Sequence, residues 1–197
     1  MQWFEDEVRA LELRLRGTPA GRLVFYGSST IRLWPDLGKD FPGAINAGFG
    51  GSTLNACAWF YDRLVGPLRP RHLVLYVGDN DVGDGAGLEL FHQRLRDLFN
   101  TIDHFHPGLP ITWLTIKPSP SRAALLPQIQ LANDLARGLL AVRGRSVVVE
   151  VCRPLLDQGS QPIPALFQAD GLHLSAAGYA ALRAALWQHL PWLRGHG

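Results

Sequence analysis

The residues best suited to chemistry lie toward the two ends of the chain. Asp170 stands three residues before His173, in a predicted turn. A carboxylate at that spacing can hold one imidazole in one tautomer, as a general base requires. Near the other end, Ser28 and Ser29 follow the apolar run at residues 22–26. A hydroxyl, a carboxylate and an imidazole in this chain order predict acyl transfer through a covalent ester.

The two serines share a predicted strand-to-helix turn, and their spacing barely separates them. We favour Ser29 as the nucleophile, since a hydroxyl there is exposed and the helix amino end stabilises nearby negative charge. The alternative is that Ser28 or Ser29 only caps the helix, a position that serine prefers. The stretch is not a G-x-S-x-G elbow, so the precedent of the α/β-hydrolases does not apply. For His173, the alternative orienting carboxylate is Asp157.

A glycine-rich turn at residues 48–53 can supply a donor to a developing oxyanion. It reads Gly-Phe-Gly-Gly-Ser-Thr, and the candidate donor is the N–H of Gly51. The alternatives are a plain glycine turn and a phosphate loop. The spacing fits neither G-x-G-x-x-G nor G-x-x-x-x-G-K-[ST], so it argues against a nucleotide.

A second polar turn, Gly-Asp-Asn-Asp at residues 78–81, places the side-chain amide of Asn80 directly after an apolar run. This amide is a second candidate donor to the oxyanion. The alternatives are an Asx turn that ends a strand and a calcium loop. The calcium loop fails because Gly83 and Leu90 occupy its fifth and twelfth positions, so we expect no metal.

These groups need elements to hold them, and short apolar runs alternate with longer amphipathic ones along the chain. The pattern predicts strands at 22–26, 44–46, 72–77, 111–116 and 146–151. It predicts helices at 3–16, 53–65, 88–106, 125–142 and from the cap Ser175 to Pro191. Continuously apolar strands are typical of a parallel sheet buried by helices on both faces. In such sheets the ligand site lies beyond the carboxyl ends of the strands, where the candidate residues fall.

Composition limits the function classes. With 197 residues, 47% hydrophobic and 18% charged, the chain predicts one globular domain over 1–197, with an N-terminal helix (1–20) packed on it. Its charged residues are scattered along the chain and give a net charge of only +2, which argues against a nucleic-acid partner. An acidic N-terminus and the lack of a long apolar run predict a cytoplasmic protein without membrane insertion. Cys57 and Cys152 are expected to be buried free thiols.

Together the candidate residues resemble the SGNH hydrolases, the GDSL-type esterases and lipases. Ser29, Gly51, Asn80 and the pair Asp170 and His173 stand in the family's order, in blocks spread from residue 27 to residue 173. The resemblance implies a three-layer α/β/α sandwich with a flavodoxin-like parallel sheet of five strands, and no cofactor. It also implies that the nucleophile is Ser29 and that the N–H groups of Ser29 and Gly51 and the amide of Asn80 form the oxyanion hole.

The chain departs from the family strings at three positions. Ser28 and Thr30 stand where the G-D-S-L string has Asp and Leu, and Leu174 stands where a proline is frequent. None of these changes removes a group that does chemistry. We therefore expect activity to be retained.

The expected function is hydrolysis of small or short-chain acyl esters, including O-acetylated carbohydrate. Trp34, Lys117 and Arg122 are candidate substrate contacts, with core packing of the aromatic ring and solvent exposure of the cations as alternatives. An acyl thioester or a lysophospholipid remains open as substrate, as does an acyltransferase on the same site. A non-catalytic binding module is a further alternative, and a homo-oligomer is left open.

Overall fold

The centre of the protein is a five-stranded sheet in which every neighbouring pair is parallel, in the order β2-β1-β3-β4-β5. The computed structural model describes residues 1–194; residues 195–197 of the predicted domain lie outside the described residues. The strands are β1 (Leu23–Gly27), β2 (Ile45–Asn46), β3 (His72–Tyr76), β4 (Ile111–Leu114) and β5 (Ser146–Val149). This order is the flavodoxin-like one, which confirms the predicted fold class.

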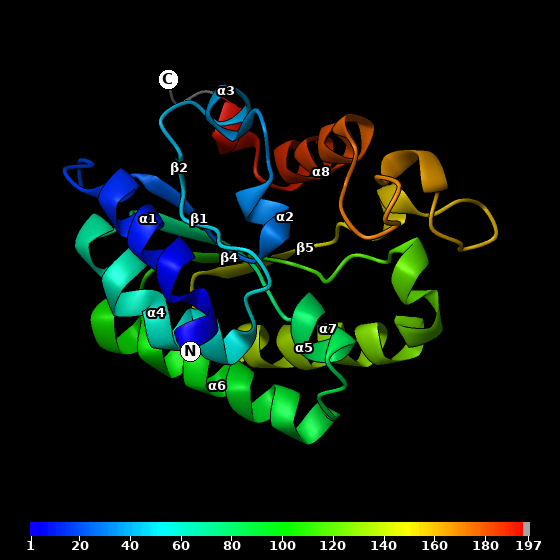
Figure 1. The fold of residues 1–197 in the computed structure, drawn as a ribbon, viewed down its shortest axis with the longest axis horizontal. Coiled ribbons are helices and arrows are strands. Elements are labelled where there is room, and N and C mark those ends of the chain that lie inside the picture. The colour runs from blue at the N-terminus through cyan, green and yellow to red at the C-terminus, as the bar shows by residue number, and fades with distance from the viewer. Residues whose placement is uncertain (195–197) are drawn as a thin grey trace.

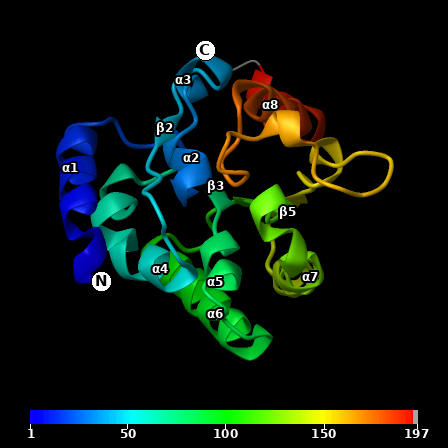
Figure 2. The same ribbon diagram turned by 45° about the vertical axis from the view of Figure 1, so that its right-hand side comes forward.

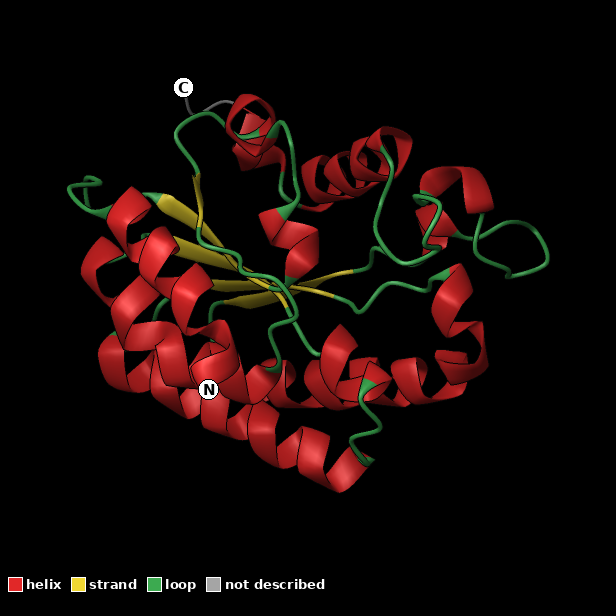
Figure 3. Cartoon of the chain, in the orientation of Figure 1, coloured by secondary structure: helices red, strands yellow, loops and turns green. Residues whose placement is uncertain are grey.

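Helices cover both faces of the sheet (Figure 1). One face carries α1 (Glu5–Leu15), α4 (Leu54–Leu64), α5 (Asp79–Gly83), α6 (Leu88–Phe105) and α7 (Leu126–Val142), and the other carries α2 (Ser29–Arg32), α3 (Leu37–Asp40) and α8 (Ala176–His189). Figures 2 and 3 show the same three layers, with the sheet between the two helical layers. Short 3-10 helices occupy Gln2–Phe4, Gly66–Leu68, Pro120–Leu125, Arg153–Leu155, Pro164–Leu166 and Pro191–Arg194.

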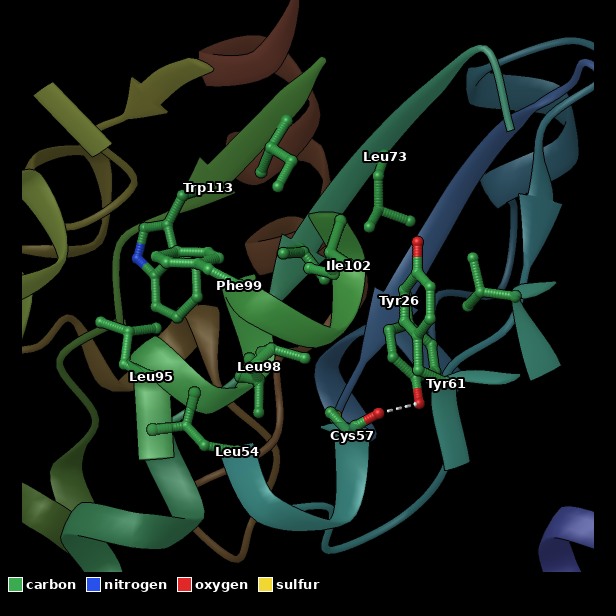
Figure 4. Packing of buried hydrophobic residues seen from close by; sticks show 14 of the residues in the cluster. Tyr26, Leu54, Cys57, Tyr61, Leu73, Leu95, Leu98, Phe99, Ile102 and Trp113 are labelled. Atoms are coloured by element: carbon green, nitrogen blue, oxygen red, sulfur yellow. Dashed lines mark hydrogen bonds between the residues drawn. The ribbon is translucent and has the colours of Figure 1, made fainter. Parts of the chain in front are cut away.

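The core has two parts because successive side chains of a strand point to opposite faces. From β1, Val24 and Tyr26 enter the α4-side cluster, which is built with α1, α4, α6 and α7. Its neighbours Leu23 and Phe25 enter the α8-side cluster, which is built with α2, α3 and α8. Figure 4 shows part of the α4-side cluster, where the Tyr26 hydroxyl donates to the carbonyl of Cys57 over 2.8 Å. Both faces of the central strands are therefore buried.

The predicted helix boundaries agree with the structure to within two residues, and the expected caps are present. The side chains of Thr53 and Ser175 accept hydrogen bonds from the N–H groups of Ala56 and Gly178, at the starts of α4 and α8. The expectation that all five strands are buried on both faces is wrong for β2 and β5, which are the edges of the sheet. In β5 the side chain of Val147 is 40% exposed. None of the helices within residues 1–194 has the length and apolarity needed to cross a membrane.

Candidate active site

The end of β1 fixes where Ser29 lies. Gly27 has a φ of 133°, and a Cβ atom there would lie 1.9 Å from the carbonyl oxygen of Tyr76 in β3. Only glycine fits this approach. The next residue, Ser28, donates its N–H to the same carbonyl over 2.9 Å, and α2 begins at Ser29. The chain therefore turns sharply at the carboxyl end of the sheet and starts a helix there.

The structure distinguishes the two serines. Ser28 is the N-cap residue of α2, but no side-chain cap bond is made there, and its side chain is buried. The Oγ of Ser29 lies 3.1 Å from Nε2 of His173. Ser28 therefore occupies the cap position without a side-chain cap bond, and the hydroxyl of Ser29 faces the imidazole.

Asp170 orients the imidazole of His173. Nδ1 of the imidazole lies 2.6 Å from Oδ2 of Asp170, while Oδ1 accepts the N–H groups of Leu172 and His173 over 2.9 Å and 3.0 Å. The hydrogen bond with His173, followed by those two N–H groups, lowers the pKa of Asp170 to about 2. An ionised Asp170 keeps the proton on Nδ1 and leaves Nε2 to accept from Ser29. The alternative carboxylate, Asp157, instead accepts from the N–H of Gln161 in its own loop.

The glycine turn at residues 48–53 lies against the nucleophile helix. The side chain of Asn46 donates to the carbonyl of Ile31 over 2.7 Å and accepts the N–H of Gly48 over 3.0 Å. A Cβ atom at Gly48 would lie 2.6 Å from the backbone nitrogen of Arg32. Three residues further on, Gly51 has a φ of 66°. Close packing of Gly48 on α2 therefore fixes the start of the turn that carries Gly51.

The N-terminal helix reaches the same turn through Glu7. Its Oε1 accepts the N–H of Gly50 over 3.0 Å and lies 2.7 Å from Nε of Arg32. One carboxylate thus joins α1, α2 and the glycine turn. Neither the N–H of Ser29 nor that of Gly51 donates to another group in the part of the chain that the structure describes. Both N–H groups are therefore candidate donors.

Asn80 joins the site from α5. Its Nδ2 donates to the carbonyl of Ser52 over 3.0 Å, which places its amide beside the glycine turn. The following residue, Asp81, accepts the N–H of Leu54 over 2.8 Å and pairs with Arg94 over 2.9 Å. Burial raises the pKa of Asp81, against the hydrogen bonds that lower it. Asp81 therefore locks α5 to the start of α4, and with it the position of Asn80.

The side chains of the three predicted substrate contacts turn inward: Trp34 and Lys117 are buried, which corrects their assignment, and Arg122 lies beside Asn80. Trp34 is 3% exposed in the α8-side cluster, where its Nε1 donates to Asp40 over 2.8 Å. Lys117 is 1% exposed, and its Nζ lies 2.9 Å from the buried carboxylate of Asp79. Arg122 also binds Asp79 and turns inward rather than to solvent. Lys117 and Arg122 turn inward because the carboxylate with which they pair is buried.

The two cysteines are not alternative nucleophiles. Cys57 and Cys152 are free, Cys57 buried and Cys152 half-buried, and burial raises the pKa of both thiols to about 12. They are therefore neutral and poor nucleophiles. Within the described residues, no three His, Cys, Asp or Glu side chains are grouped to hold a metal ion.

Sequence reasoning missed the residues that support the site. Glu7 and Asn46 bind the glycine turn and Asp79 binds Arg122, but Glu7 lies outside the four motif blocks and the sequence assigns no role to Asn46 or Asp79 within theirs. The one available signal was Asp79, a carboxylate directly after a buried strand, because a charge in that place needs a partner.

The chain matches the model of the GDSL-like lipase/acylhydrolase family over residues 24–181. Its fold is similar to a protein of Streptococcus pneumonia described provisionally as a platelet activating factor (23% identity, 96% of this chain and 95% of that one, TM-score 0.81). It is also similar to a GDSL-like lipase of Bacteroides thetaiotaomicron (19% identity, 97% of each chain, TM-score 0.73). A third similar structure is an acetyl xylan esterase of Geobacillus stearothermophilus (15% identity, 86% of this chain and 94% of that one, TM-score 0.68). None of the curated proteins matches this chain.

Proposed function

Because the chain belongs to the GDSL-like lipase/acylhydrolase family, we propose that it is a serine ester hydrolase that works through an acyl-enzyme. One observation carries the proposal: the continuous line of contacts from Ser29 Oγ to His173 Nε2 at 3.1 Å and from His173 Nδ1 to Asp170 Oδ2 at 2.6 Å. A hydroxyl, a base and an orienting carboxylate in this geometry are the parts that nucleophilic acyl transfer needs.

In the first half-reaction His173 Nε2 takes the proton of Ser29 as its Oγ attacks the acyl carbonyl. The carbonyl oxygen becomes an oxyanion, which the N–H groups of Ser29 and Gly51 and the amide of Asn80 bind. As the intermediate collapses, the imidazolium returns its proton to the departing alcohol. Asp170 stabilises that imidazolium and remains ionised throughout.

In the second half-reaction water replaces the alcohol. His173 takes a proton from the water as its oxygen attacks the acyl carbon of the Ser29 ester, and the same donors bind the second oxyanion. Collapse of this intermediate breaks the ester and returns the proton to Ser29 Oγ. The acid leaves and the free enzyme is restored.

We propose small acyl groups, acetyl above all, as the substrate class, with O-acetylated carbohydrate as the preferred alcohol side. No long apolar insertion separates the motif blocks between residues 27 and 173, and a lid over a long acyl chain needs one. The similarity to an acetyl xylan esterase agrees with this choice. A series of p-nitrophenyl esters of increasing chain length, run beside a panel of acetylated sugars, tests it: a maximum rate at long chains contradicts the choice.

The test of the nucleophile compares Ser29→Ala with Ser28→Ala. The first variant should lose at least about 10³-fold in kcat on p-nitrophenyl acetate and should no longer be labelled by a fluorophosphonate. The second should retain most of the rate and the labelling, because Ser28 does not face His173. Hydrolysis by Ser29→Ala at the parent rate would refute the proposal. Product analysis with a competing alcohol then separates hydrolysis from transfer.

A further inference from the structure

Arg122 lies against the oxyanion side of the candidate site. It belongs to the 3-10 helix Pro120–Leu125, which follows β4. Its Nη1 donates to both the backbone carbonyl and the carboxylate of Asp79, and its Nη2 lies 3.3 Å from Oδ1 of Asn80. The side chain is 13% exposed. A nearly buried guanidinium thus bridges the first two residues of α5.

The contact with Arg122 determines which way round the Asn80 amide sits. A guanidinium carries donors only, so the atom of Asn80 that faces it must be the carbonyl oxygen. The amide nitrogen then points the opposite way, where one of its two protons goes to the carbonyl of Ser52 over 3.0 Å. The second proton is left for the oxyanion of the substrate.

Arg122 also supplies charge. It and Lys117 both pair with the carboxylate of Asp79, so this buried group of three residues keeps one positive charge in excess. A hydrogen bond from a cation to the amide oxygen polarises the amide and strengthens its N–H donors. This polarisation reaches the developing oxyanion through the N–H of Asn80.

The segment that carries Arg122 is fixed to the other half of the site as well. The N–H of Ser121 donates to the carbonyl of Gly171 over 3.0 Å, in the turn between Asp170 and His173. On the other side, the guanidinium lies over Gly83, where a Cβ atom would come within 2.5–2.8 Å of it. Arg122 has room to reach Asn80 only because residue 83 has no side chain.

We infer that Arg122 is a positioning residue of the oxyanion hole, which orients and polarises the Asn80 amide for the transition state. The inference rests on the proposed esterase function. It assigns Arg122 no contact with the substrate, so its effect belongs in kcat and not in KM.

Two variants remove the contact in different ways. Arg122→Met deletes the guanidinium and leaves Asp79 paired with Lys117. Gly83→Ala keeps Arg122 but pushes its flexible end away from Asn80. Both should lower kcat on p-nitrophenyl acetate about tenfold with KM nearly unchanged, a smaller loss than the ~10²–10³-fold expected for Asn80→Ala. Arg122→Lys keeps the charge without the planar fork and should lie between parent and Arg122→Met.

The decisive measurement is a double-mutant cycle with Asn80→Ala, with thermal unfolding of each variant as the check on folding. In the Asn80→Ala background, Arg122→Met and Gly83→Ala should cost no further rate, because their effect passes through the missing amide. An equal loss in both backgrounds, or parent kcat in both single variants, overturns the inference. If Arg122→Met does not fold, the Gly83→Ala cycle decides. Full activity of Ser29→Ala would instead overturn the esterase function itself.

Discussion

Two aspartates near the site are ionised for different physical reasons. Asp170 is 46% exposed, and hydrogen bonds from His173 and two backbone N–H groups lower its pKa to about 2. Asp79 is almost fully buried. Burial opposes its ionisation, but the charges of Lys117 and Arg122 outweigh burial and lower its pKa. The first carboxylate orients a base at the surface, and the second holds cations beneath the oxyanion side.

At the residue scale, Asp170→Asn tests the orienting role. The asparagine retains an oxygen for the backbone N–H groups but can present its NH₂ group to Nδ1 of His173. The imidazole then carries its proton on Nε2 and cannot accept from Ser29. We expect kcat to fall on the order of 10³–10⁴-fold with little change in KM. A fall of less than about tenfold in steady-state assays would show that Asp170 does not set the tautomer.

The difference in stability between the parent and the same variant should depend on pH. The pKa of Asp170 is lowered on folding, from about 3.9 in an unfolded chain to about 2, so its stabilisation is complete above the unfolded value and is lost as pH falls toward 2. The difference in Tm between parent and Asp170→Asn should shrink as the pH falls from 4 to 2. A difference that grows on acidification contradicts this sign.

The residue types and their order could be read from the sequence, and the directions of the long side chains could not. Asp170 stands three positions before His173 in one turn, and Ser29 follows directly on a strand, so local patterns show all three. Arg122 finds its partner Asp79 43 positions earlier in the chain, which no local pattern encodes. Neither a substrate contact nor solvent exposure, the two interpretations that the sequence offered for Arg122, anticipates this pairing.

At the element scale, the site depends on two turns that only glycine can make. Gly27 lets β1 end against the Tyr76 carbonyl, and Gly48 lets the next turn contact α2. Apolar runs predicted the strands well in the middle of the sheet, where both faces are covered. They could not predict that β5 would be an edge with an exposed Val147, because strand order depends on how the helices cross over.

Gly27→Ala tests the first turn, with Gly138→Ala in α7 as the matched control. The Cβ atom at Gly27 has no space beside the Tyr76 oxygen, and the left-handed φ adds strain. We expect a loss of about 3 kcal/mol or more in the free energy of unfolding and a loss of activity, because Ser29 moves with the turn. At Gly138 no atom lies within 4 Å of the new Cβ, and alanine should add about 0.5–1 kcal/mol. Equal stability of the two variants in urea titrations would contradict the close approach.

At the scale of the whole molecule, the site is assembled from both helical layers. Ser29 and His173 lie beside the α8-side cluster, at the start of α2 and just before α8, while Asn80 comes from α5 on the opposite face (Figure 1). The sheet separates the two helical layers, its strands send alternate side chains into the two clusters, and the site lies beyond the carboxyl ends of these strands. The relative position of nucleophile and oxyanion donor therefore depends on the sheet as a single body.

Because the α4-side and α8-side clusters share the strands of one sheet, we expect them to unfold together. Leu98 and Leu186 are fully buried, in the α4-side and α8-side clusters respectively. Truncation of either to alanine should cost about 2–5 kcal/mol and shift one common transition, because neither cluster can lose its packing while β1 and β3 remain folded. Trp113 reports on the first cluster and Trp34 on the second, so tryptophan fluorescence and far-ultraviolet circular dichroism should coincide in urea for both variants. Two separated transitions in Leu186→Ala would mean that the α8 layer folds on its own, and that the turn carrying Asp170 and His173 can detach from Ser29 while the sheet stays intact.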